Sequence, residues 1–141
     1  MLKHIQLYNI LDTISKICDK FKLTKINRIL IILGILFSFL DLTSSFICIS
    51  FNYLSIPGIY FYESNIFSKF FNNEVSILCG YLCEIIILIV MYLIYRKSFL
   101  TKLFGILQFF VFGFLVVFNF IVLNSVINNF YQVIKVYEII T

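Results

Sequence analysis

The sequence predicts an all-α integral membrane protein: a bundle of three transmembrane helices with an N-terminal amphipathic interfacial helix. Composition is the first indication. Of the 141 residues, 62% are hydrophobic and only 13% are charged, whereas a soluble domain is about half apolar and about one quarter charged. A folded chain of this length buries only about two-thirds of its surface, so lipid must solvate many of the apolar side chains. This excludes ordinary soluble enzymes, zinc fingers and disordered tails.

Three apolar runs are the second indication, because each meets the requirement of about 20 residues for crossing a bilayer. They cover residues 29–51, 75–95 and 103–127, and none of them contains Lys or Arg. Backbone polar groups in hydrocarbon must be satisfied within the segment, so each run is expected to be an α-helix. The three-span domain therefore covers residues 29–127.

The preceding segment, residues 1–28, has the pattern of an amphipathic helix. Apolar side chains recur on one side at helical spacing: Leu7, Ile10, Leu11, Ile14, Ile17, Cys18 and Phe21. Asp12 and Lys16 lie on the opposite side, four residues apart, where they can pair. We expect this helix to lie on the cytoplasmic leaflet of the membrane. The alternative is a solvated helix that packs on a partner protein.

The positions of Lys and Arg predict the orientation of the chain. Six cations precede the first span and three lie between the second and third spans. The first loop contains only Lys69, and the interfacial tail at 128–141 contains only Lys135. Since short cytoplasmic segments carry the excess of Lys and Arg, we expect a multi-pass protein with its N-terminus in the cytoplasm and its C-terminus outside.

Small and polar residues form a seam along one face of each span. In the first span it consists of Gly34, Ser38, Asp41, Ser45, Cys48 and Asn52. The second and third spans contribute Ser76, Gly80, Cys83 and Glu84, and then Gly105, Gln108, Phe112, Leu115 and Asn119. Small residues let helices approach closely, and polar ones hydrogen-bond between helices. The seams therefore predict a compact bundle.

Asp41 and Glu84 are two acids inside the predicted spans. Asp41 follows Arg28 by thirteen residues, and Glu84 precedes Arg96 by twelve. At a rise of about 1.5 Å per residue these separations are roughly 20 and 18 Å. The two acids are therefore expected at one level, provided that their helices are neighbours. An acid near the bilayer centre costs roughly 2.5–3.5 kcal/mol on insertion scales and commonly marks function.

Three states of these acids are open, because no basic side chain of the chain can reach them at that depth. Both acids can be neutral and hydrogen-bonded within the bundle. The candidate partners are Ser38, Ser45, Gln108 and Asn119. The acids can instead share a proton or bind a cation. In the third state, a partner subunit supplies the missing Lys or Arg.

Two short elements, "FLDLTSSF" and "YESNIF", resemble motifs of an uncharacterised prokaryotic family of small multi-pass membrane proteins, a domain of unknown function. That family pairs an intramembrane Asp-x-x-Thr-like element with a Glu-x-Asn-Pro element. Asp41 with Thr43 or Ser44 matches the first element, and Glu63 with Asn65 matches the second. Ile66 stands where the family usually has proline. The resemblance implies a membrane protein with no established activity. From the residues alone, Glu63 and Asn65 are interpreted as the cap of a short interfacial helix, with a ligand site as the alternative.

Recognisable catalytic and cofactor motifs are missing from the sequence. No phosphate-binding Gly-rich loop or zinc-protease motif occurs, and the four cysteines and single histidine do not form a metal-ligand pattern. We therefore expect no cofactor, no metal and no nucleic-acid partner; the expected partners are lipid and other membrane proteins, or further copies of the chain. The leading hypothesis is a non-enzymatic subunit or assembly factor of a larger membrane complex. The alternative is a small ion- or proton-coupled transporter or channel-forming oligomer that uses Asp41 and Glu84, and a weaker one is an intramembrane enzyme using the same acids.

Overall fold

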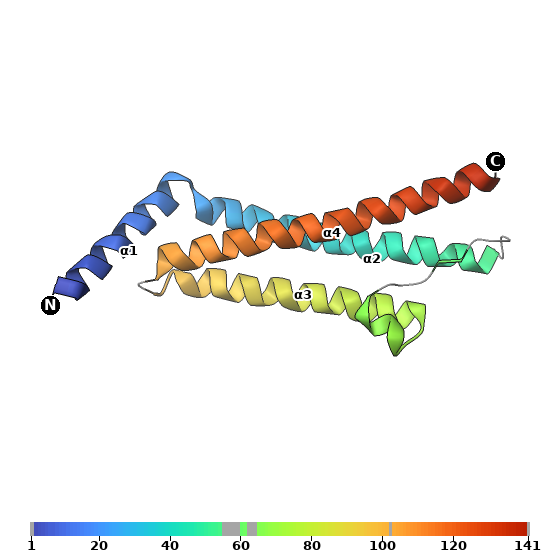
Figure 1. The fold of residues 1–141 in the computed structure, drawn as a ribbon, viewed down its shortest axis with the longest axis horizontal. Coiled ribbons are helices and arrows are strands. Elements are labelled where there is room, and N and C mark those ends of the chain that lie inside the picture. Colours follow the sequence, from blue (N-terminus) through green and yellow to red (C-terminus); the bar gives the residue numbers. More distant parts are fainter. Residues whose placement is uncertain (1, 55–59, 62–64, 102, 141) are drawn as a thin grey trace. The chain divides into compact units, whose positions relative to one another are not determined.

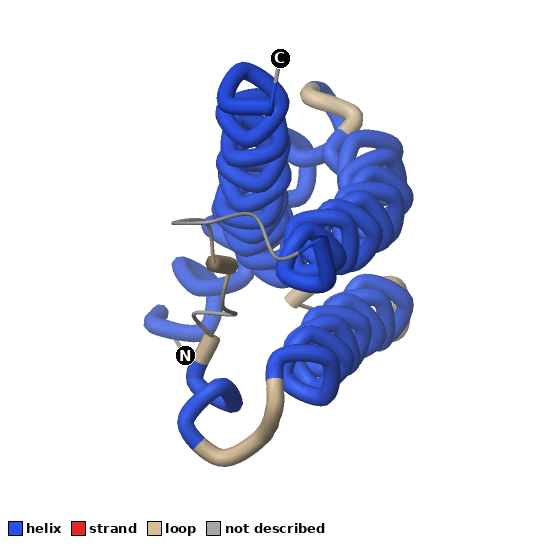
Figure 2. Tube along the Cα trace, turned by 90° about the vertical axis from the view of Figure 1, so that its right-hand side faces the viewer, coloured by secondary structure: helices blue, strands red, loops and turns tan. Residues whose placement is uncertain are grey.

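The computed structural model describes residues 2–54, 60–61, 65–101 and 103–140, with the side chains of all of these except residues 2–6 and 54. All regular structure in these ranges is helical, as Figure 1 and Figure 2 show, which confirms the predicted fold class. In chain order the elements are α1 (Leu2–Lys20), α2 (Leu23–Ser50), the 3-10 helices η1 (Phe51–Leu54) and η2 (Ile66–Lys69), α3 (Asn73–Ser98) and α4 (Phe104–Ile140).

Three of these helices are long and apolar enough to cross a membrane, as the apolar runs predicted. The candidate spans are Leu23–Tyr53, Asn73–Ser98 and Phe104–Ile140. The third differs from the expected run, which ended at residue 127, because α4 continues without a break through the segment interpreted as a separate tail. No Gly or Pro follows Gly113 before the end of α4, so nothing in the local sequence stops the helix.

Two compact units divide the chain. The first unit consists of Met1–Gly34 and Ile87–Asn119, and the second unit consists of Ile35–Ile86 and Phe120–Thr141. Both contain parts of α2, α3 and α4. The first unit also contains α1, and the second contains the two 3-10 helices.

Helix α1 of the first unit packs closely on the start of α4. A Cβ atom added to Gly105 would lie 2.9 Å from the backbone nitrogen of Ser15 and 2.8 Å from Cγ2 of Ile14. Cys18 on the same helix is fully buried, and the predicted pair of Asp12 and Lys16 forms with 2.7 Å between Oδ2 and Nζ. The absence of a side chain at position 105 is therefore what allows this approach.

A buried polar network joins α2, α3 and α4 within the first unit. The Asn27 amide donates to the Gln108 backbone oxygen at 2.9 Å and to its side-chain Oε1 at 2.7 Å, and Gln108 Nε2 donates to Ser98 Oγ at 2.6 Å. All three side chains are fully buried. In surroundings of low dielectric such bonds are electrostatically strong, so the network fixes the register of three helices at this end.

The second unit has the inverted pattern expected of a lipid-solvated bundle. Its buried residues are small, polar or β-branched: Ser38, Ser44, Ser45, Cys48, Ile49, Ser76, Ile77, Val122, Val126 and Val136. Large apolar side chains point outward instead, such as Ile86, which is 58% exposed, and Phe120, which is 72% exposed. Small buried residues let the helices approach one another closely, and this close packing surrounds the site described next.

Candidate functional site

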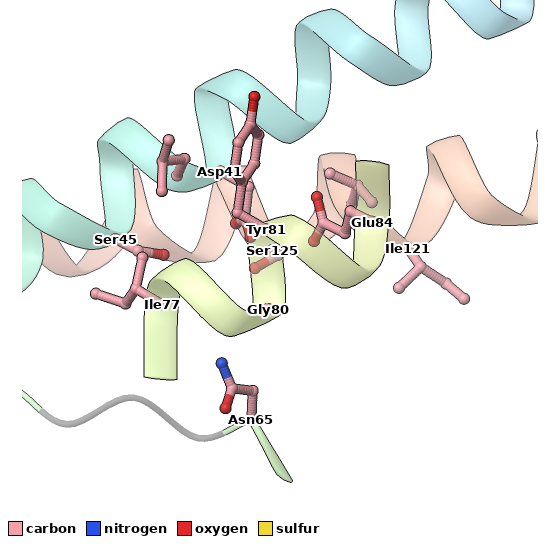
Figure 3. A pocket seen from close by; sticks show the side chains of 11 residues that line it. Asp41, Ser45, Asn65, Ile77, Gly80, Tyr81, Glu84, Ile121 and Ser125 are labelled. Atoms are coloured by element: carbon pink, nitrogen blue, oxygen red, sulfur yellow. The ribbon is translucent and has the colours of Figure 1, made fainter. Parts of the chain in front are cut away.

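A cavity of about 230 Å³ lies within the second unit. Three helices contribute its polar lining: Asp41 and Ser45 come from α2, Tyr81 and Glu84 from α3, and Ser125 from α4. Asn65, which precedes η2, completes the polar lining. The remaining lining residues are Leu42, Ile77, Gly80, Ile121 and Val122. Figure 3 shows the labelled residues of α2, α3 and α4 gathered around the cavity, with Asn65 approaching from the side of Gly80.

Both intramembrane acids thus line one cavity. The sequence placed Asp41 and Glu84 at one level from the rise per residue alone, and their common cavity confirms this for the second unit. Both side chains are only partly exposed, and the Oε2 atom of Glu84 is buried. The described lining residues bring these two carboxyl groups together with hydroxyl and amide side chains.

Asn129 of α4 holds the Asp41 side of the site. Its side-chain nitrogen donates to Ser44 Oγ and Ser45 Oγ, each at 3.0 Å, and lies 3.3 Å from Asp41 Oδ1. Its backbone oxygen accepts from the Cys48 thiol at 3.3 Å. One residue of α4 therefore contacts four residues over two turns of α2, and this fixes the position of the Asp41 carboxyl group relative to α4.

Asn65 fastens the short helix η2 to α3 beside the cavity. Its Oδ1 accepts from the Phe67 backbone nitrogen at 2.9 Å, and its Nδ2 donates to the Ser76 backbone oxygen at 2.7 Å. A Cβ on Gly80 would come within 2.9 Å of Asn65 Nδ2, so a larger residue at position 80 would displace the Asn65 amide. The predicted capping role is confirmed for Asn65, since it is the N-cap of η2. Glu63 lies outside the described residues.

The other candidate polar residues have different surroundings. Ser45 lines the cavity, whereas Ser38 is fully buried and its hydroxyl has no hydrogen-bond partner among the described residues. Gln108 and Asn119 were considered as partners of the acids, but both belong to the first unit. Gln108 bonds Asn27 and Ser98, and Asn119 Nδ2 donates to the backbone oxygens of residues 30 and 115. Within the described chain these two amides therefore support helix packing.

Three site residues were missed by the sequence interpretation: Tyr81, Ser125 and Asn129. Asn129 was overlooked because the third span was ended at residue 127. Helical periodicity continued from Val122 through Val126 would have found it, since steps of four and three residues lead to position 129 on the same face. Ser125 lies within hydrogen-bonding reach of the Asp41 carboxyl group, and no signal in the sequence separates it from other serines.

Comparisons with models of known protein families, with curated proteins and with solved structures give no match. The polar side chains of the cavity lining carry carboxyl, hydroxyl and amide oxygens, which are groups that suit protons and hard cations. Among the described residues, no group of three or more His, Cys, Asp or Glu side chains could hold a metal ion.

Proposed function

We propose that the protein handles a small cation within the membrane, a proton or an alkali-metal ion, with Asp41 and Glu84 as the binding carboxylates. The observation that carries this proposal is the common cavity lined by both acids together with hydroxyl and amide side chains. Two ionised carboxylates removed from water repel one another and lose their hydration, and a proton or cation between them relieves both costs. The protein then acts as a small ion- or proton-coupled transporter and not as an enzyme.

Hydrogen bonding around Asp41 supports the same conclusion. Asn129 and Ser125 offer an amide and a hydroxyl to this carboxyl group, which stabilise it without neutralising its charge. The competing view, that the acids only hold helices together, explains a polar contact between helices. It does not by itself explain why two acids line a space of about 230 Å³, which is large enough for water or a hydrated ion.

The experiment is a flux measurement on purified protein in liposomes with an imposed ion gradient. Asp41→Asn and Glu84→Gln should each abolish transport. Glu74→Gln should leave it unchanged. Glu74 is the matched control because it lies on the same helix as Glu84, outside the cavity, and accepts a hydrogen bond from the Tyr53 hydroxyl at 2.6 Å that glutamine can also accept.

Ion identity is tested in the same vesicles. A pH-sensitive dye reports proton movement, and radioactive sodium or potassium reports alkali-ion movement, each with the membrane potential set independently. Transport by Asp41→Asn at the wild-type rate would contradict the proposal. So would absence of flux and of cation binding in wild-type protein that retains its helical content.

A second candidate function is that of a subunit or assembly factor of a larger membrane complex. It is supported by the exposed polar side chains of Asn124 and Asn128 on α4, since amides in a lipid-facing position favour a protein neighbour. Purification in mild detergent followed by mass spectrometry distinguishes the two candidates. A stoichiometric unrelated protein supports the subunit role, whereas flux from the isolated chain supports the transporter.

We also propose that the N-terminus is cytoplasmic, that the C-terminus is outside, and that α1 lies against the inner leaflet. The exposed apolar residues Leu7 and Ile10 on α1 support contact with lipid. Cys18 is fully buried and is a poor probe of sidedness. Exposed Lys20 and Tyr60 are better positions: a cysteine replacing Lys20 should react only from the inside, and one replacing Tyr60 only from the outside.

The resemblance to the family of unknown function is likewise a proposal. Asp41 and Asn65, one residue from each element, are twenty-four positions apart in the sequence, yet they line the same cavity. Their convergence supports the proposal that both elements serve one site. Asn65→Ala tests whether both elements serve one site, because it should displace η2 from α3 and thereby reduce flux. If Asn65 only caps η2 and has no role at the cavity, the substitution should leave transport unchanged.

A further inference from the structure

A row of polar side chains lies along the exposed face of α4 in the second unit. Asn124, Asn128, Tyr131, Lys135 and Glu138 are all exposed and recur at alternating steps of four and three residues. We call these five residues the outer stripe. Among the described residues, neither Asn124 nor Asn128 has a side-chain hydrogen-bond partner.

The two asparagines of the outer stripe face away from the bundle. Each follows a buried valine by two residues, Val122 before Asn124 and Val126 before Asn128. At about 100° per residue, each amide therefore points roughly 200° away from the buried face of α4. This is the side that lipid would cover in a single chain.

The same asparagines lie level with residues inside the candidate span of α2. Asn129, adjacent to Asn128, contacts Asp41, Ser44 and Ser45. These three residues belong to the candidate span Leu23–Tyr53 and are far from its ends. Asn128 and Asn124 are therefore close to the level of Asp41. In a bundle that spans the membrane, the hydrocarbon at this level offers no water to satisfy their amides.

We propose that a second copy of this chain covers the outer stripe, forming a parallel homodimer in which Asn124 and Asn128 hydrogen-bond across the interface. A carboxamide carries both donors and an acceptor, so two identical amides satisfy one another. Copies inserted in the same orientation can be related by a two-fold axis along the membrane normal, which sets each stripe residue against its own counterpart. The observations that support this proposal are separate from those that support ion transport.

The spacing and the charges of the outer stripe suit the same arrangement. Alternating steps of four and three residues form the contact seam of a left-handed pair of helices, where a buried Asn fixes the register. At the end of the stripe, Lys135 and Glu138 carry opposite charges, so Lys135 of one copy can pair with Glu138 of the other. Within each copy Lys135 already lies over the Tyr131 ring, with 4.7 Å between Nζ and the ring centroid.

The first test measures self-association by fluorescence energy transfer in vesicles over a range of protein-to-lipid ratios. Dyes are attached to Lys20→Cys in a Cys83→Ala background, which removes the exposed native cysteine. Joint substitution of Asn124 and Asn128 by Leu should raise the dissociation constant of the dimer about tenfold. The control substitutes Leu jointly for Phe130 and Ile134, which are exposed on α4 but off the stripe, and should leave association unchanged.

The second test is oxidative cross-linking in the same Cys83→Ala background. Asn128→Cys should form an intermolecular disulfide readily, because the two-fold axis brings position 128 of both copies together. Phe130→Cys should form it much more slowly. A wild-type chain that stays monomeric at every protein-to-lipid ratio overturns the proposal. So does equal association of the Leu variant, cross-linking that favours position 130, or an unrelated protein occupying the stripe in place of a second copy.

Discussion

Replacing Asn129 by Leu is expected to weaken the attachment of α4 to α2 by about 1–3 kcal/mol. The Asn129 side-chain nitrogen lies near three acceptors, Asp41 Oδ1, Ser44 Oγ and Ser45 Oγ, but it has two hydrogens and can satisfy two of them at once. Hydrogen bonds between membrane helices average about 0.6 kcal/mol and reach about 1.7 kcal/mol. Two such bonds give the stated range. Leu has a similar size, so a packing defect adds little.

The free energy of unfolding can be measured by steric trapping in bicelles, at a dilution where the chain is monomeric. Asn128→Leu is the matched control, because it makes the same substitution one residue away on the exposed side of α4. It should leave the stability of the monomer unchanged or raise it slightly, since leucine is better solvated by lipid than an unpaired amide. Equal losses for the two variants would refute the assignment of Asn129 to the bundle interior.

Three further predictions concern the first unit. Gly105→Ala should speed the reaction of Cys18 with thiol reagents, because the new Cβ would meet the backbone of α1 at about 2.9 Å and loosen that helix. Gly113→Ala is the control and should not change the rate, since a Cβ at position 113 has nothing within 4 Å. Equal labelling of the two variants would contradict the packing of α1 on α4. Burial raises the pKa of the Cys18 thiol, so its alkylation should accelerate at higher pH than that of the unfolded chain. Because the folded state then holds the proton more tightly, the free energy of unfolding should fall as the pH rises through the ordinary thiol range, and a stability independent of pH there would count against it. Gln108→Leu should lower stability by about 1–3 kcal/mol in the same unfolding assay, because it removes two buried hydrogen bonds, the one from Asn27 to Oε1 and the one to Ser98, and leaves Asn27 bonded only to the backbone oxygen of residue 108; a neutral effect would show that the network contributes no net stability.

The spans and the common level of the two acids followed from sequence because each depends on one local quantity. Hydropathy over about 20 residues identifies a membrane helix whatever its neighbours are. Counting the rise per residue from flanking cations gave Asp41 and Glu84 similar depths, and they line one cavity. The pairing of Asp12 with Lys16 is equally local, because four residues on a helix form one turn.

Hydrogen-bond partners did not follow from sequence, because they depend on which helix faces are in contact. Asn27 lies just before the apolar run 29–51, and Asn129 lies just after the apolar run 103–127. Both nevertheless supply polar contacts between helices, Asn27 in the first unit and Asn129 in the second. A span that is predicted from hydropathy ends where polar residues begin. A helix continues through such residues when a neighbouring helix satisfies them, and the sequence of α4 alone does not reveal that neighbour.

Asn128 and Asn129 present the same side chain to opposite sides of one helix, and this links the two proposals physically. On the inward side, the amide nitrogen lies within hydrogen-bonding distance of the Asp41 carboxyl group and of two serine hydroxyls, and it can donate to two of these three at once. A proton or cation that binds to Asp41 competes with the Asn129 amide for the same carboxyl oxygen. Binding in the cavity therefore changes the contacts that fix the rotational position of α4 about its axis. Because α4 is a continuous helix from Phe104 to Ile140, any rotation also turns the outer stripe. Ion binding and self-association therefore act on one rigid element, and each should bias the other unless the serine contacts alone hold α4 in place.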